Sequence, residues 1–361
     1  VTVPGVNPAA AAAAFGAAFG GTAEADWRAL IDRAAAMWQI TREPFLQSPL
    51  RGWRSLLSLA RDPSDVATIA PTRSLADLGR QYLADPRLQQ VLWRYATYAG
   101  SDPRRAPAVL ATIPYVEQAF GAWHLGGGLG TLADALLARC EQRGVQVRTG
   151  TGVSRILLER GRVSGVVTDD GERLAADIVV ANADASHVYG DMIDDRRARD
   201  EARRLARTTP SLAGFVILAA VRGRTPGIHH HNVWFPDRYE DEFDAIFSGR
   251  VPQDPAIYAC VPADPAMTPD ADHESWFLLI NAPRHDPGRG TDWTSPGLAD
   301  AYAQRILDLL AERGTDIRSR LLWHEVRTPA DLQATTGAPG GSIYGTSSNG
   351  SRAAFQRPAN A

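Results

Sequence analysis

Two short stretches of the chain could contact a bound cofactor. The first is Gly126–Gly130, with the sequence Gly-Gly-Gly-Leu-Gly, which opens a predicted helix that ends at Gly144. Glycine amides at a helix start can cradle phosphate. A dinucleotide fingerprint beginning at Gly126 would need glycine where Thr131 stands, and no convincing strand precedes the loop. The residues therefore favour a turn in which backbone passes close to another part of the molecule, with phosphate binding as the alternative.

The second stretch is the polar loop Asn182–Asp184. It follows the wholly apolar run Ile178–Ala181, which predicts a buried strand. Ligands of α/β folds bind at the carboxyl ends of such strands, so cofactor contact is one interpretation of this loop. A predicted hairpin that starts at Val153 and reverses at Gly161 leads into the same region, and an ordinary hairpin and loop is the alternative.

Three side chains are candidates for proton transfer, although the sequence assigns no catalytic base. His124 directly precedes the glycine loop, and an imidazole suits acid or base work near neutral pH. Tyr98 and Asp102 are similar candidates. For all three the alternative is structural: a packed or hydrogen-bonded histidine and tyrosine, and an aspartate in an Asp-Pro turn.

The run His229–His231 suggests a metal cluster at first sight. Neighbours on a strand point to opposite faces, so three consecutive histidines on a strand would not chelate one ion together. We therefore predict no metal site, and expect these histidines at a strand edge or lining a pocket.

Composition narrows the class of protein. The 361 residues carry a formal net charge of −3 and no block of Lys or Arg, which argues against nucleic acid as a partner. The only cysteines, Cys140 and Cys260, allow neither a disulfide framework nor a CxxC site, so we expect a reducing, cytoplasmic location. No apolar run reaches the length of a membrane-spanning helix.

Apolar periodicity predicts a chain in successive blocks. Residues 1–24 look structurally weak, and helices follow up to about residue 125. Short strands separated by Gly and Pro between 211 and 326 predict an antiparallel sheet. Within the helical block, Leu50–Arg61 places Trp and Leu on one face with Arg at its margins. That pattern fits a helix lying on a membrane surface, with an ordinary covering helix as the alternative.

The order of these motifs resembles the phytoene desaturase family of FAD-dependent carotenoid and retinoid oxidoreductases. The segments of this chain that carry the resemblance are the glycine loop, the hairpin and the Ala176–Asp184 segment. Further stretches with the same resemblance are Tyr98–Pro103, His230–Phe235, Asp254–Pro262, Asp264–Pro269, Gly341–Gly345 and Phe355–Pro358.

The resemblance implies an α/β (α+β) protein. A discontinuous three-layer FAD/NAD(P)-binding domain would carry an inserted antiparallel-sheet substrate domain and a helical lid. The corresponding parts are a lid at 1–125, the centre of the FAD domain at 126–190, the substrate domain at 191–336, and the return to the FAD domain from 337 to 361. The residues that it places near FAD are Val153, Asn182, Ala183 and Asp184. Gly127 and Gly128 are further cofactor candidates, from the glycine loop itself.

The implied reaction is desaturation of a membrane-dissolved carotenoid or other isoprenoid, or its isomerisation or saturation, by hydride exchange with the flavin. Peripheral membrane contact through Leu50–Arg61 would accompany it. This chain has no strand–GxGxxG–helix unit, so we expect an internal fragment that does not hold FAD tightly alone. The alternatives are an amine-oxidase-like flavoprotein with a polar substrate, and a non-catalytic remnant.

Overall fold

The computed structural model describes residues 1–48 and 62–350. They form two compact units, one built from residues 1–123 with 346–350 and the other from residues 124–345. The predicted Leu50–Arg61 helix lies outside the described residues.

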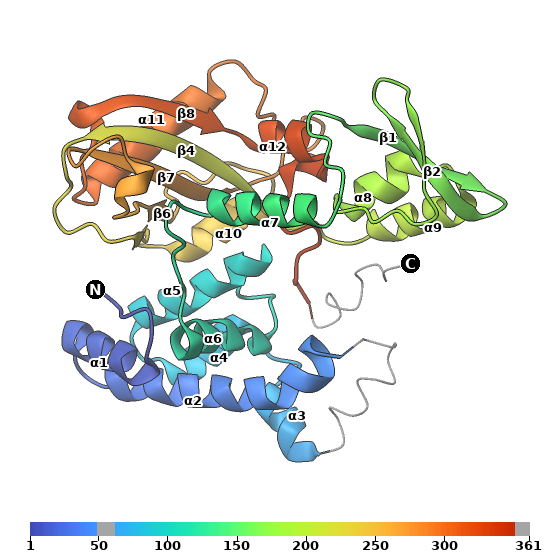
Figure 1. Ribbon diagram of the computed structural model, residues 1–361. Coiled ribbons are helices and arrows are strands. Elements are labelled where there is room, and N and C mark those ends of the chain that lie inside the picture. Colours follow the sequence, from blue (N-terminus) through green and yellow to red (C-terminus); the bar gives the residue numbers. More distant parts are fainter. Residues whose placement is uncertain (49–61, 351–361) are drawn as a thin grey trace. The chain divides into compact units, whose positions relative to one another are not determined.

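The first unit is helical, as predicted. Its helices are α1 (Pro8–Phe19), α2 (Ala23–Thr41), α3 (Pro63–Ile69), α4 (Leu75–Tyr82), α5 (Pro86–Arg94) and α6 (Thr112–Phe120) (Figure 1). Ser74 caps α4 in a reciprocal capping box with Asp77, and Pro86 starts α5. The buried side of α2, including Trp27 and Leu30, centres the core of this unit.

The expectation that residues 1–24 are structurally weak is wrong. The alanine tract forms most of α1, because alanine is the strongest helix former and Asn7 caps the helix through the amides of Ala9 and Ala10. Phe15 then lies buried, with its ring centroid 4.7 Å from that of Trp27.

The second unit combines two antiparallel sheets with helices, which confirms the α/β (α+β) class. One sheet has the order β1-β2-β3 and the other β5-β6-β7-β4-β8. The elements are α7 (Gly130–Gln142), β1 (Val153–Glu159), β2 (Arg162–Thr168), β3 (Arg173–Ala175), α8 (Ala185–His187), α9 (Arg196–Leu205), β4 (Ala213–Arg222), β5 (His231–Trp234), α10 (Tyr239–Phe247), β6 (Ile257–Cys260), β7 (His273–Ala282), α11 (Leu298–Glu312), β8 (Leu321–Arg327) and α12 (Pro329–Thr336). The domain boundaries expected at 126, 191 and 337 stay predictions.

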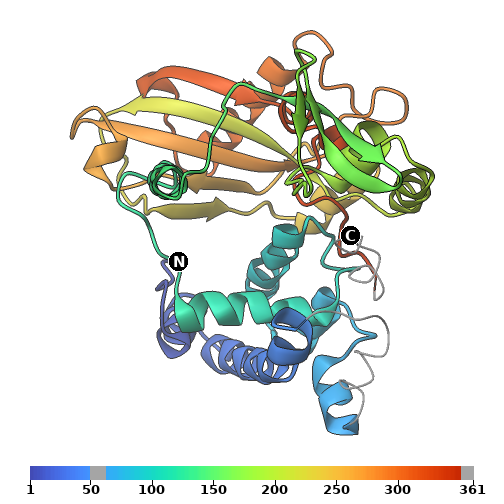
Figure 2. The same ribbon diagram turned by 45° about the vertical axis from the view of Figure 1, so that its right-hand side comes forward.

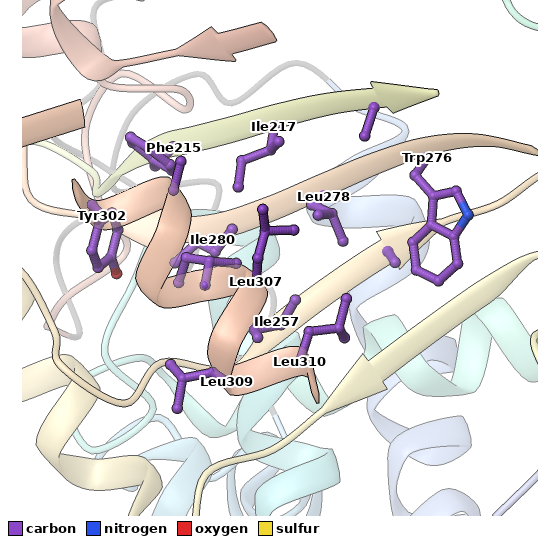
Figure 3. Close-up of a cluster of buried hydrophobic side chains, with 14 of the residues drawn as sticks. Phe215, Ile217, Ile257, Trp276, Leu278, Ile280, Tyr302, Leu307, Leu309 and Leu310 are labelled. Atoms are coloured by element: carbon purple, nitrogen blue, oxygen red, sulfur yellow. The ribbon is translucent and has the colours of Figure 1, made fainter. Parts of the chain in front are cut away.

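Helix α11 covers one face of the five-stranded sheet. Its Ile306, Leu307 and Leu310 pack against alternate residues of β4, β6 and β7, of which Phe215 and Leu278 are fully buried (Figure 3). Strand side chains alternate between faces, so the intervening residues of the same strands lie on the opposite face.

The predicted hairpin at Val153 is confirmed. β1 and β2 pair from Val153–Thr168 to Glu159–Arg162, and the turn places Arg160 and Gly161 at positive φ. The hairpin packs through Ile156 on residues 188–193, which lead into α9 (Figure 2).

The predicted buried strand at Ile178–Ala181 is wrong. These residues form no strand, and Ile178 and Val180 are 81% and 89% exposed. A wholly apolar strand is buried when strands pair with it on both sides, and no strand among the described residues pairs with this segment. Helix α7 likewise buries none of its side chains. Among the described residues, no helix has both the length and the apolar character needed to cross a bilayer.

Candidate functional site

The glycine loop makes a tight turn before α7. Gly127 and Gly128 adopt φ values of +78° and +87°, which L-residues rarely adopt. The Gly128 amide donates to the carbonyl of Leu125 at 2.8 Å, and a Cβ on Gly128 would lie 3.1 Å from Cε of Met267. The loop therefore needs glycine for its backbone conformation and because it passes close to the segment around Met267.

Asp264 holds this loop in place. Its carboxylate accepts from the Gly127 amide at 2.7 Å and from the Ala266 amide at 2.9 Å, and it lies 2.8 Å from Nε2 of His124. The hydrogen bond with His124, followed by those from the two amides, lowers the pKa of Asp264 to about 2. The Asp264 carboxylate thus accepts the hydrogen bond from the Gly127 amide that a bound phosphate would otherwise accept. This arrangement agrees with a turn in which the backbone passes close to another segment.

Asp264 is the residue of this site that sequence reasoning missed. It lies 140 residues beyond His124, and only the fold brings the two together. The available signal was its Asp-Pro sequence, because Asp264 caps the short helical turn at 265–267. The structure gives His124 a carboxylate partner, while its role in proton transfer stays a prediction.

Val153 lies at the open end of the hairpin, next to a backbone with little room for side chains. A Cβ on Gly152 would lie 2.0 Å from Oδ2 of Asp169, and the Asp169 amide donates to the Gly152 carbonyl at 3.0 Å. Val153 itself is exposed. The Asp169 carboxylate therefore fills the space beside Gly152, and cofactor contact at Val153 stays a prediction.

The Asn182–Asp184 loop lies beside a segment from the other end of the unit. Asp184 caps α8 through the Ser186 amide at 2.8 Å, and its Oδ2 would lie 3.7 Å from a Cβ on Gly345. Gly345 is tied to the segment just before β4, because its carbonyl accepts from the Ser211 amide at 2.8 Å. Asn182 and Ala183 are exposed, so their cofactor contact stays a prediction.

The two remaining candidates, Tyr98 and Asp102, belong to the helical unit. Tyr98 is exposed and packs edge-on against Tyr95 at 5.3 Å. Asp102 is buried, and its carboxylate accepts from the Arg104 amide and pairs with the Arg104 guanidinium at 2.8 Å. The carboxylate is thus engaged in the turn that the Asp-Pro sequence suggests, and catalytic roles for both residues stay predictions.

The expectation that the consecutive histidines point apart is wrong for His230 and His231. His230 lies at a bend before β5 rather than within the strand, and the two ring centroids are 4.5 Å apart.

Comparison with known proteins agrees with the resemblance stated above. The family model described as flavin containing amine oxidoreductase matches residues 24–272. The chain belongs to this family. It is 33% identical over 350 residues to hydroxyneurosporene desaturase of Cereibacter sphaeroides, covering 95% of this chain and 68% of the relative. It is 30% identical over 328 residues to 4,4'-diapolycopene oxygenase of a Methylomonas species, covering 89% and 64% respectively. The resemblance to carotenoid desaturases of the phytoene desaturase type is confirmed.

Solved structures support the fold. A crystal structure of an oxidoreductase from Methanosarcina mazei matches with a TM-score of 0.50 at 19% identity, over 70% of this chain and 56% of that one.

The chain spans about two thirds of the length of the two curated relatives, hydroxyneurosporene desaturase and 4,4'-diapolycopene oxygenase.

Proposed function

We propose that this chain supplies the substrate-binding part and the centre of the flavin domain of an FAD-dependent oxidoreductase. Its substrate would be a carotenoid or related isoprenoid, which it would desaturate, isomerise or saturate. The observation that carries the proposal is the 33% identity to a hydroxyneurosporene desaturase over 95% of the chain. The bound flavin would accept a hydride from a saturated carbon, while the protein orients the substrate and excludes water.

We propose that four of the described residues would contact FAD. The strand end at Val153 and the residues Asn182 and Ala183 are exposed, and Asp184 of the same loop lies near Gly345. These groups would contact the cofactor. Gly127 fits less well, because its amide already donates to Asp264.

The five-stranded sheet offers an apolar floor that suits an isoprenoid. On the face opposite α11, the register aligns Val216 with Leu279 and Leu218 with Phe277 across β4 and β7. On the same face Leu279 is aligned with Tyr258 of β6. Phe277 is 38% exposed, although it is a large apolar residue in a central strand. The apolar part of this face, over β4, β6 and β7, favours a carotenoid over a polar amine, because a charged amine would lose its hydration there. The β8 edge of the same face carries Glu325 and Arg327, which pair with each other.

The test is expression of the protein containing this chain, with its flanking coding sequence, in a host that accumulates an acyclic carotenoid. Absorbance of extracted pigments should reveal a product with a changed number of conjugated double bonds. Phe277→Glu should lower product formation at least about tenfold, because a carboxylate facing an apolar chain costs more than about 1.4 kcal/mol. Leu322→Glu is the matched control, since Leu322 is also exposed and lies at the bulge of the edge strand β8.

Unchanged pigments with folded, flavin-loaded protein would contradict the proposed reaction. Equal product from the Phe277 variant and the wild type would contradict only the apolar floor.

We also propose a cytoplasmic enzyme in peripheral contact with the membrane in which its substrate dissolves. Liposome co-sedimentation tests this contact, and binding that survives Trp53→Glu would argue against a role for Leu50–Arg61.

A further inference from the structure

Three side chains with metal-binding atoms meet at the edge of the five-stranded sheet. β5 is the edge strand, and its His231 is aligned with Cys260 of β6. His230 immediately precedes β5. One potential ligand atom from each of these three residues lies within 4.8 Å of the other two.

The local sequence fixes the bend that brings the two histidines together. The Asn232 side chain accepts from the His229 amide at 3.0 Å and donates to the His229 carbonyl at 2.6 Å. The carbonyl of His230 accepts from the Val261 amide at 2.8 Å, which anchors the bend to the end of β6. Hydrogen bonds to the backbone of His229 and of His230 therefore fix the bend from both sides. As a result, the rings of His230 and His231 do not alternate across the sheet.

We propose that His230, His231 and Cys260 bind one divalent cation of the zinc class, with a fourth position open to water. Two imidazole nitrogens and one thiolate form a donor set that zinc accepts, whereas magnesium and calcium prefer oxygen. At zinc–nitrogen and zinc–sulfur distances of about 2.1 and 2.3 Å, tetrahedral ligand atoms lie about 3.3–3.6 Å apart. The potential ligand atoms, which lie up to 4.8 Å apart, would thus have to approach one another by about 1 Å through side-chain movement.

The groups around the cluster suit this role. The Tyr258 hydroxyl lies 2.8 Å from Nδ1 of His231, which orients the ring and leaves Nε2 as the nitrogen for a metal. The ring of His124 lies 4.8 Å from that of His230 and is tied to the Asp264 carboxylate. A carboxylate near the site would offset part of the positive charge that remains after one thiolate binds a divalent ion.

The protonation states of the two histidines suit metal binding, whereas the thiol of Cys260 must lose a proton to bind. Burial, together with the neighbouring histidines, lowers the pKa of His230 and His231, so both rings favour the neutral form that binds metals. Burial raises the pKa of the Cys260 thiol. Binding then exchanges the thiol proton for the metal, and one proton is released per ion bound.

Cobalt substitution tests the site without relying on enzyme activity. The reduced protein, made without a polyhistidine tag, is titrated with Co²⁺ and monitored by absorption. We expect one equivalent to give a thiolate-to-cobalt charge-transfer band and intense visible bands, both removed by Zn²⁺. Cys260→Ser should abolish the charge-transfer band. The matched control Cys140→Ser should keep it, because Cys140 lies on α7.

Two histidine variants complete the test. His231→Gln should weaken binding at least about a hundredfold, since loss of even a group that only supports a ligand costs about 10–100-fold. His324→Gln, on β8, should leave binding unchanged. The proposal fails if the wild type shows no charge-transfer band, if the band persists in Cys260→Ser, or if Cys140→Ser loses it. Since the sequence holds only two cysteines, the wild-type spectrum decides the matter even if one variant does not fold.

Discussion

Replacing Gly128 with alanine should destabilise the glycine loop. Gly128 has a φ of +87°, where a residue with a Cβ pays about 1–2 kcal/mol. The new Cβ would lie 3.1 Å from Cε of Met267, but that contact adds little because the end of a methionine side chain can move. We expect Gly128→Ala to lower the free energy of unfolding by about 1–2 kcal/mol.

Gly130 provides a control two residues away. It begins α7 without a positive φ, and a Cβ there would meet no atom within 4 Å. Alanine in a helix is favoured over glycine by about 0.5–1 kcal/mol, so Gly130→Ala should be neutral or stabilising. The two variants should therefore differ by about 1.5–3 kcal/mol, although the chemical change is the same.

Urea denaturation followed by circular dichroism measures this difference. The comparison holds when the dependence of stability on denaturant is equal in both variants. Equal stability of Gly128→Ala and Gly130→Ala would refute the claim that the turn requires glycine at 128.

Three further outcomes follow from buried or charged contacts. The pKa of Asp264 lies at about 2 in the folded protein against an ordinary 3.8, so its contribution to stability is present above pH 3.8 and is lost as the pH falls through about 2. Asp264→Asn should therefore flatten the acid dependence of stability in this range, and an unchanged profile would contradict it. Glu242→Ala leaves the Ala256 amide and the Asn281 side-chain amide without their buried acceptor, which should cost about 2–6 kcal/mol in denaturation. Phe15→Ala should cost about 3–5 kcal/mol, whereas a loss below 1 kcal/mol would mean that α1 is not part of the core.

Local signals predicted most of the elements. The helical block up to about residue 125 and the short strands between 211 and 326 follow from local periodicity and turn residues, and the structure confirms both. The Gly161 turn likewise marked the hairpin correctly.

Features that depend on distant partners escaped prediction. Ile178–Ala181 has the composition of a buried strand, but a strand also needs neighbours, which the described residues do not supply. The pairing of His124 with Asp264 spans 140 residues, and the contact between Asp184 and Gly345 spans even more. The bend at His230 depends on the two hydrogen bonds between the Asn232 side chain and the His229 backbone, which a simple strand alternation does not anticipate.

The most direct test of the proposed function is anaerobic mixing of the flavin-loaded protein containing this chain with a carotenoid, followed by absorption spectroscopy. We expect the absorbance of oxidised flavin to fall as that of a longer polyene rises, and a primary amine to cause no change. Flavin that stays oxidised with acyclic carotenoids but is reduced by an amine would contradict the account and favour the amine-oxidase alternative.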